Sequence, residues 1–101
     1  MIHKINKIYQ SVMSELAFPG NFNTKETRQK YTVLITTKLN DVTKQEFQIK
    51  CDEENNSIEL IDDCLLCVRI SWKYDASPAY KYVDLIFGNI EQIKKLGHKY
   101  C

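Results

Sequence analysis

Two cysteines near the middle of the sequence, with a histidine and a cysteine at its end, have the spacing of a zinc ligand set. They form C-x2-C and then H-x2-C, in the order Cys64, Cys67, His98 and Cys101. Three thiolates and one imidazole can hold a tetrahedral zinc ion. The residues between the first two cysteines are leucines, in a segment that predicts a β-strand, where residues three apart point to opposite faces. We therefore expect these side chains to bind no metal, and we expect no cofactor.

The fourth cysteine, Cys51, is a spare thiol for the same set. A free cysteine behaves as a small apolar residue, and thiols stay reduced in the cytosol. We expect Cys51 and Cys67 to be buried, Cys101 to be a thiol of the C-terminal tail, and no disulfide to form.

The sequence offers no set of residues that resembles a catalytic site. His98 and Cys101 could act as base and nucleophile, but their position at the chain end offers no third group to orient them. No serine stands in a nucleophile elbow, and no glycine-rich loop could hold phosphate. With three glycines and two histidines, the chain is poor in catalytic residue types, and we expect it not to be an enzyme.

Charge is distributed most unevenly between residues 51 and 63, which include six acidic residues and no basic one. The acidic residues are Asp52, Glu53, Glu54, Glu59, Asp62 and Asp63. One interpretation is a solvated hairpin whose charges discourage pairing at a sheet edge. The other is a negative surface that steers the protein onto a positively charged partner. The residue pattern of a calcium loop is absent, so we expect no metal here either.

The chain has 101 residues and a net charge of +1, and we expect one globular domain over residues 1–101. Direct nucleic-acid binding is not expected, because such proteins usually carry a strong basic excess. No apolar run approaches the roughly 20 residues that span a bilayer, and the N-terminus lacks the apolar core of a signal peptide. We expect no membrane association and a cytoplasmic location.

Hydrophobic periodicity predicts the elements that must position these residues. Strict alternation from Leu65 to Tyr74 predicts a half-buried strand. Its core face carries Trp72, which we expect to be buried, and its other face carries Arg69 and Lys73. Further strands are predicted at 31–36, 47–51 and 58–61, and the short turns between them make consecutive strands antiparallel neighbours.

Two amphipathic helices are predicted at the ends of the chain. Apolar residues at helical spacing run from Ile2 to Leu16. Ser77 as N-cap and Pro78 at the first helical position predict a second helix that ends before Gly97. The alternative is a fifth strand at 80–87 followed by a short helix, and Gly88 inside the run weakens the preferred helix. The predicted fold is α+β, a four-stranded antiparallel meander flanked by an N-terminal and a C-terminal amphipathic helix in a two-layer sandwich.

These features predict a small non-catalytic protein that binds another protein. The most concrete form is a stoichiometric inhibitor of a nucleic-acid-handling protein, of the toxin-immunity or phage anti-defence type. The acidic hairpin would occlude a basic surface on a nuclease or a nucleoprotein complex. A composition rich in Lys, Asn and Ile is typical of AT-rich bacterial or phage genomes.

Two alternatives remain open. One is a nucleic-acid-binding module, zinc-stabilised or with a basic face, that uses Arg69, Lys73 and the nearby tyrosines. The other is a structural homodimer whose subunits pair through the open face of the sheet.

Overall fold

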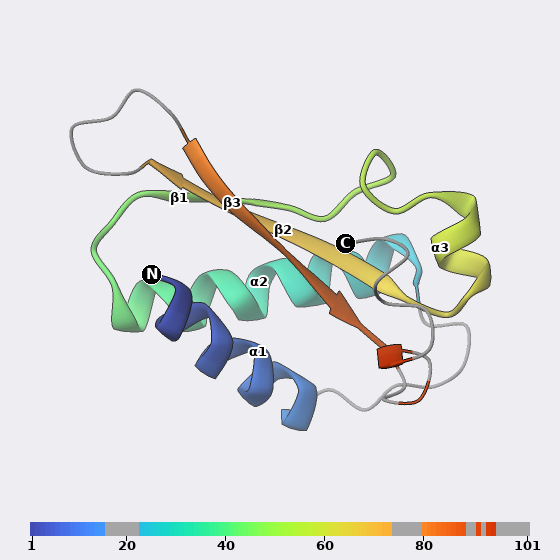
Figure 1. The fold of residues 1–101 in the computed structure, drawn as a ribbon, viewed down its shortest axis with the longest axis horizontal. Helices are drawn as coiled ribbons and strands as arrows, with labels where there is room; N and C mark the ends of the chain where they lie inside the picture. Colours follow the sequence, from blue (N-terminus) through green and yellow to red (C-terminus); the bar gives the residue numbers. More distant parts are fainter. Residues whose placement is uncertain (16–22, 74–79, 89–90, 92, 95–101) are drawn as a thin grey trace.

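The computed structural model describes residues 1–15, 23–73, 80–88, 91 and 93–94 of the chain. In this part, one antiparallel sheet of three strands, in the order β1-β2-β3, has two long helices on one face (Figure 1). The elements are α1 (Ile2–Glu15), α2 (Lys25–Val42), β1 (Phe47–Lys50), α3 (Ile58–Asp62), β2 (Leu66–Lys73) and β3 (Tyr80–Phe87). The protein is therefore α+β, but the predicted four-stranded meander between terminal helices is wrong.

The N-terminal helix is confirmed over Ile2–Glu15. Its buried residues are Ile5, Ile8 and Val12, which recur every three or four positions and pack in the main core. Lys38 of α2 binds the C-terminal end of α1. Its Nζ donates to Glu15 Oε1 at 2.8 Å and to Ser11 Oγ at 2.9 Å.

The strand predicted at 31–36 is wrong, because these residues lie inside α2. Thr24 caps this helix, since its hydroxyl accepts a hydrogen bond from the Thr27 backbone N–H. Tyr31, Ile35 and Leu39 recur every four residues and are buried against the sheet. The burial of this helical stripe has a larger effect than the β-propensity of the three threonines and the one valine between these residues.

Two threonines of α2 use their hydroxyls in a way that suits a helix. Thr32 Oγ1 donates to the carbonyl of Arg28 and Thr37 Oγ1 to that of Val33, both at 2.9 Å. Such bonds to the preceding turn let threonine occupy helical positions. The short turn expected between the strands at 31–36 and 47–51 is also wrong, because α2 continues to Val42.

The central strand, β2, is confirmed over Leu66–Lys73. Val68, Ile70 and Trp72 are buried in the same cluster as the apolar residues of α1 and α2. Across the β1–β2 pair, Phe47 lies opposite Trp72 and Ile49 opposite Ile70. Trp72 is 4% exposed, which confirms its predicted place in the core.

The helix preferred for the C-terminal part is wrong over Tyr80–Phe87, which forms β3 and pairs antiparallel with β2 from Lys73↔Tyr80 to Leu66↔Phe87. Alternate residues of a strand lie on the same face of the sheet. The strand conformation therefore places both Leu85 and Phe87 in the core. The alternative of a strand and then a short helix fits better, since residues 91, 93 and 94 are helical. The predicted N-cap, Ser77, with Pro78, and the stop at Gly97 lie outside the described residues.

The strand predicted at 58–61 is also wrong, because these residues form the short helix α3. Ser57 is its N-cap, with a side chain that accepts from the Leu60 backbone N–H. Leu60 packs in a smaller cluster with Leu65, Cys67 and Ile86. None of the helices in the described part of the chain is long and apolar enough to cross a lipid bilayer.

Candidate functional site

The acidic residues predicted to bind a partner occupy the connection between β1 and β2, which is a loop and a helix rather than a hairpin. Asp52, Glu53 and Glu54 form the exposed loop after β1. The other three belong to α3: Glu59 and Asp62 are exposed in it, and Asp63 is its half-buried C-cap. We call these six residues the acidic segment.

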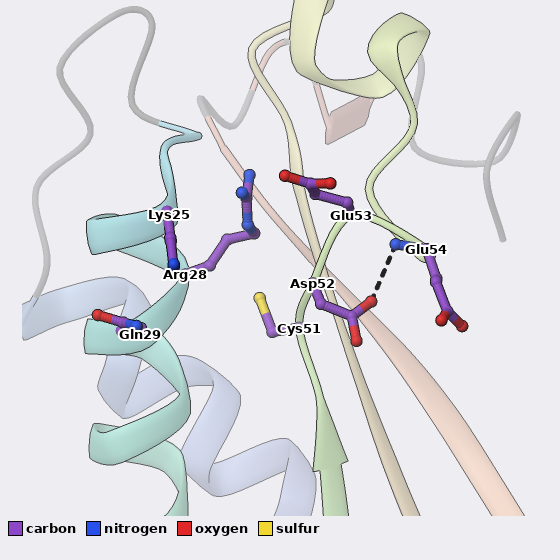
Figure 2. Close-up of a pocket in the computed structure, with 7 residues that line it drawn as sticks. All are labelled: Lys25, Arg28, Gln29, Cys51, Asp52, Glu53 and Glu54. Atoms are coloured by element: carbon purple, nitrogen blue, oxygen red, sulfur yellow. Dashed lines mark hydrogen bonds between the residues drawn. The ribbon is translucent and has the colours of Figure 1, made fainter.

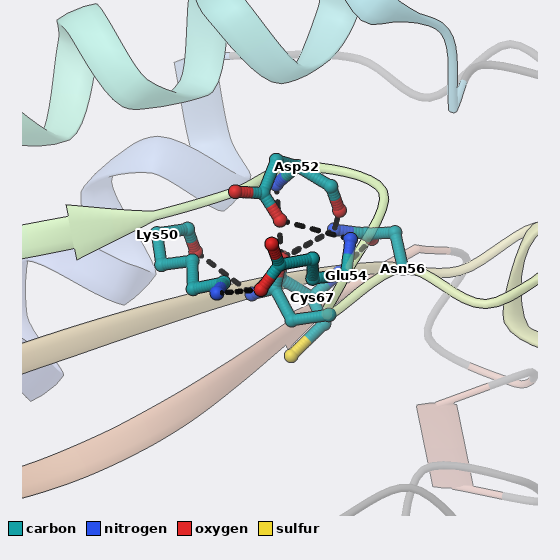
Figure 3. Close-up of polar contacts among 6 residues, drawn as sticks. Lys50, Asp52, Glu54, Asn56 and Cys67 are labelled. Carbon is teal, nitrogen blue, oxygen red and sulfur yellow. Dashed lines mark hydrogen bonds and ion pairs between the residues drawn. The ribbon is translucent and has the colours of Figure 1, made fainter.

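The loop of the acidic segment is held by short local contacts. Asn55 Oδ1 accepts from the Asp52 backbone N–H at 2.9 Å, and Asn55 Nδ2 donates to the Lys50 carbonyl at 2.8 Å. Asp52 Oδ1 accepts from the Glu54 backbone N–H at 2.9 Å, and the Lys50 ammonium pairs with the Glu54 carboxylate (Figure 3). The backbone of residues 52–55 is therefore fixed by its own side chains, in the manner of an Asx-turn.

A second asparagine anchors the loop to the central strand. Asn56 is 2% exposed. Its Oδ1 accepts from the Cys67 backbone N–H at 2.8 Å, and its Nδ2 donates to the carbonyls of Cys67 at 3.0 Å and Asp52 at 2.9 Å (Figure 3). The side-chain amide thus continues the hydrogen-bonding ladder beyond the end of β1, where backbone pairing has stopped.

This anchor continues into the start of α2. Asn23 Nδ2 donates to Asn56 Oδ1 at 3.1 Å and to the Leu65 carbonyl at 2.8 Å. Arg28 Nη1 donates to Asn23 Oδ1 at 2.7 Å, and the Arg28 side chain is buried, with 7% of the residue exposed. A chain of buried polar groups therefore sets the position of the loop relative to both α2 and β2.

A hollow of about 430 Å³ separates the loop from α2 (Figure 2). Its walls are Lys25, Arg28 and Gln29 of α2 on one side and residues 51–54 on the other. Burial raises the pKa of the Cys51 thiol to about 12, so this group is protonated at neutral pH and is a poor nucleophile. The residues that line this hollow can bind a partner through charge and hydrogen bonds, but its thiol is not activated as a nucleophile.

The four residues that have the spacing of a zinc ligand set, and that we expected to bind no metal, are only partly described. Cys64 lies in the turn before β2 and packs against the main core, whereas Cys67 belongs to the smaller cluster. His98 and Cys101 lie outside the described residues. Within the described part of the chain, no three His, Cys, Asp or Glu side chains are placed to hold a metal ion. Cys67 is buried as expected, while Cys51 is only half-buried.

The outer face of the sheet forms a second polar surface. Arg69 Nε and Nη2 donate to the two carboxylate oxygens of Asp84 at 2.8 and 3.0 Å. The guanidinium also lies 4.1 Å from the centre of the Tyr82 ring. Tyr80 and Tyr82 are each 60% exposed, so aromatic and cationic groups meet on this face as the nucleic-acid alternative requires.

A comparison of the chain with protein families, curated proteins and solved structures finds no match. The sequence shows the acidic segment but not its supports, Asn23, Arg28 and Asn56. Asn56 lies beside Asn55 in a stretch typical of an exposed turn. Its partner Asn23 is 33 positions away along the chain, so no local pattern marks the pair as buried.

Proposed function

We propose that this protein acts by binding another protein through the acidic segment. The observation that carries the proposal is the anchoring of residues 52–55 by Asn55 and Asn56, which holds the backbone that bears the exposed carboxylates in one conformation. A rigid charged loop loses little conformational entropy on binding, so more of the contact energy appears as affinity.

The partner class follows from the charge. Carboxylates held on a rigid surface complement lysine and arginine side chains, which proteins that handle nucleic acids use to hold phosphate. Binding there would occlude the phosphate site. The proposed activity is therefore stoichiometric inhibition of a nuclease or a nucleoprotein complex, of the toxin-immunity or anti-defence type.

Two acidic side chains are the best candidates for direct contact. Glu54 already pairs with Lys50, and Asp52 accepts from the loop backbone. Glu53 and Glu59 are exposed, and neither side chain makes a hydrogen bond or ion pair within the described part of the chain. Their substitution should change charge without disturbing the loop, because such surface changes usually alter stability by less than about 0.5 kcal/mol.

Affinity capture with paired baits tests this proposal. The variant Glu53→Lys/Glu59→Lys is compared with wild type and with Glu26→Lys/Asp41→Lys, which makes the same change in net charge on α2. We expect the first double variant to lose a partner that wild type and the control variant both retain. Circular dichroism and thermal melting check that each bait is folded.

The captured partner is then assayed for nuclease activity with increasing amounts of this protein. Inhibition that saturates at a fixed molar ratio, and whose association rate falls as salt rises, supports occlusion by charge. A partner that both double variants retain equally would contradict a role for the acidic segment.

The exposed tyrosines of β3 favour one second candidate, which is binding of single-stranded nucleic acid on the outer face of the sheet. Tyr80 and Tyr82 could stack with bases, and Lys73 could contact phosphate. Titration of a fluorescent single-stranded oligonucleotide, with wild type and Tyr82→Ala, tests this candidate. A loss of affinity of roughly 1–3 kcal/mol in the variant would support base stacking.

A further inference from the structure

We propose that the partner contributes an extended segment, which adds to the free edge of β1 as a fourth strand and lies along α2. This inference rests on the proposed function and names the element of the partner that the site would hold. The evidence is the direction of the β1 backbone groups, the space beside them and the charges at the two ends of that space.

The direction of the backbone groups follows from the contacts of β2. The N–H and C=O of Cys67 both point toward the β1 side of the sheet, where Asn56 binds them. The carbonyl of Lys73 points the same way, because it accepts from Gln45 Nε2 at 2.7 Å. In an antiparallel pair these directions alternate along the strand, so Arg69 and Ser71 also turn their backbone groups toward β1.

The residues opposite these two are Lys50 and Gln48, which must therefore direct their backbone groups toward β2. Phe47 and Ile49 alternate with them and direct their N–H and C=O groups away from the sheet. No hydrogen bond to these outward groups is recorded within the described part of the chain. An edge of this kind is a template for pairing with another strand.

Space for another chain lies at both ends of β1. The hollow lined by Arg28, Gln29 and Cys51 lies where β1 ends (Figure 2). A second hollow of about 440 Å³ lies where β1 begins, between Thr36 and Asn40 of α2 and residues 44–48, and it extends under the start of β1 to Lys73 of β2 and Tyr80 of β3. β1 runs opposite to α2 (Figure 1). One hollow therefore lies at each end of β1, and together they mark the two ends of a groove between the strand and the helix. A groove between a helix and an edge strand is how PDZ and PTB domains hold extended peptides.

The two ends of this groove differ in charge. Where β1 ends, the carboxylates of residues 52–54 outnumber the cations Lys25 and Arg28. Where β1 begins, Lys44 and Lys73 outnumber Glu46. A complementary segment therefore carries lysine or arginine at the end that meets Asp52 and Glu53, and an acidic residue at its other end. Antiparallel pairing is slightly more stable per residue, which places the basic residues in the N-terminal half of the segment.

Selection from a random 12-residue peptide library on the immobilised full-length protein tests this inference. We expect enriched peptides with alternating β-branched residues and a basic N-terminal half. Amide hydrogen exchange of the protein, with and without a synthetic copy of an enriched peptide, measures directly which backbone groups the peptide binds. The Phe47 and Ile49 amides should exchange at least tenfold more slowly with peptide, while the Gln48 and Lys50 amides, already bonded within the sheet, change much less.

A matched pair of variants checks the location. Gln29→Trp fills the groove from α2, whereas Lys30→Trp places the same side chain on the next residue, which does not line either hollow. Gln29→Trp should weaken peptide binding at least tenfold, and Lys30→Trp should leave it unchanged. The inference is overturned if no peptide is enriched, if Gln29→Trp has no effect, or if protection appears at Tyr80 and Tyr82 instead.

The same variants separate this inference from the proposed function. If Glu53→Lys/Glu59→Lys loses the captured partner but Gln29→Trp retains it, the acidic segment binds the partner and strand addition is wrong. If the charge variant retains the partner, the proposed function itself fails.

Discussion

The side-chain amide of Asn56 binds both backbone groups of Cys67, accepting from the N–H at 2.8 Å and donating to the carbonyl at 3.0 Å. Asn56→Ala would remove the acceptor of this buried N–H and one of the two acceptors of the Asn23 amide, which keeps the Leu65 carbonyl. An unsatisfied buried donor costs about 1–3 kcal/mol, so we expect unfolding free energy in urea to fall by about 2–4 kcal/mol. Asn40→Ala, at an exposed position of α2, is the control and should change it by less than about 0.5 kcal/mol. Equal stability of the two variants would show that the anchor contributes nothing.

Trp72 fills the core between β1 and β3 on the face that α1 and α2 cover. Trp72→Ala should lower the unfolding free energy by about 3–5 kcal/mol, which is comparable with the whole stability of a small domain. Trp72 is the single tryptophan, so its fluorescence reports burial directly. Emission like that of free tryptophan in water, from the folded wild type, would contradict this position.

Cys51 should make the protein sensitive to alkali. Burial raises the pKa of its thiol from 9.0 to about 12, so the unfolded chain releases this proton at a lower pH than the folded protein. The stability that the protonated, buried thiol contributes is fully present below pH 9. As pH rises from 9 toward 12, the free energy of unfolding falls by at most about 1.4 kcal/mol per pH unit. Urea unfolding of wild type should show this decline between pH 9 and 10, and the decline should be shallower in Cys51→Ala.

The window below pH 10 separates the Cys51 thiol from the phenol of Tyr31. Burial also raises the pKa of Tyr31 above its ordinary value of 10.0, so the effect of that phenol begins only at higher pH. An identical decline in wild type and Cys51→Ala below pH 10 would assign the alkali sensitivity to other groups.

Arg69 and Asp84 form a two-point ion pair across β2 and β3. Because the Arg69 side chain is 39% exposed, water and salt weaken the pair. A double-mutant cycle with Arg69→Ala and Asp84→Ala should give a coupling of about 0.5–1 kcal/mol that shrinks at high salt. A coupling above about 3 kcal/mol, measured by urea unfolding, would mean that the pair is effectively buried.

Gly88 packs too closely against the start of β2 to accept a side chain. A Cβ atom there would lie 2.7 Å from Leu65 Cδ2 and 3.1 Å from the Cys64 carbonyl oxygen. Leu65 is fully buried, so its side chain has little space to move. Gly88→Ala should lower the melting temperature and cost about 1–3 kcal/mol. An unchanged melting temperature would show that the contact relaxes freely.

The central strand could be predicted because its alternation runs over eight residues with Trp72 in phase. The conformation of α2 could not, since Thr32, Val33 and Thr36 have high β-propensity and mask the buried stripe of Tyr31 and Ile35. Tertiary packing determines the conformation of α2, because residues at helical spacing stabilise the helix only when they are buried against the sheet. For Tyr80–Phe87, both periodicities fit the apolar residues, and pairing with β2 selects the strand.

The candidate site could also be predicted only in part from the sequence. The acidic residues are visible in the sequence because charge clusters along the chain. Their rigidity is not, since it depends on Asn23, Arg28 and Asn56, which meet only after α2, the loop and β2 have packed together. The groove beside β1 also depends on the order of the strands, because it requires that β1 lie at an edge.

Cys64 has a positive φ of 59°, a backbone conformation that costs residues with a Cβ about 1–2 kcal/mol and glycine almost nothing. Both cysteine codons differ from a glycine codon at one base, so relief of this strain is a single point mutation away. The Cys64 side chain also packs against the main core, so the change adds stability where the relieved strain exceeds the lost contact. A lineage that acquires this change could afterwards tolerate a destabilising substitution elsewhere, for example one that alters the acidic segment to follow a changing partner.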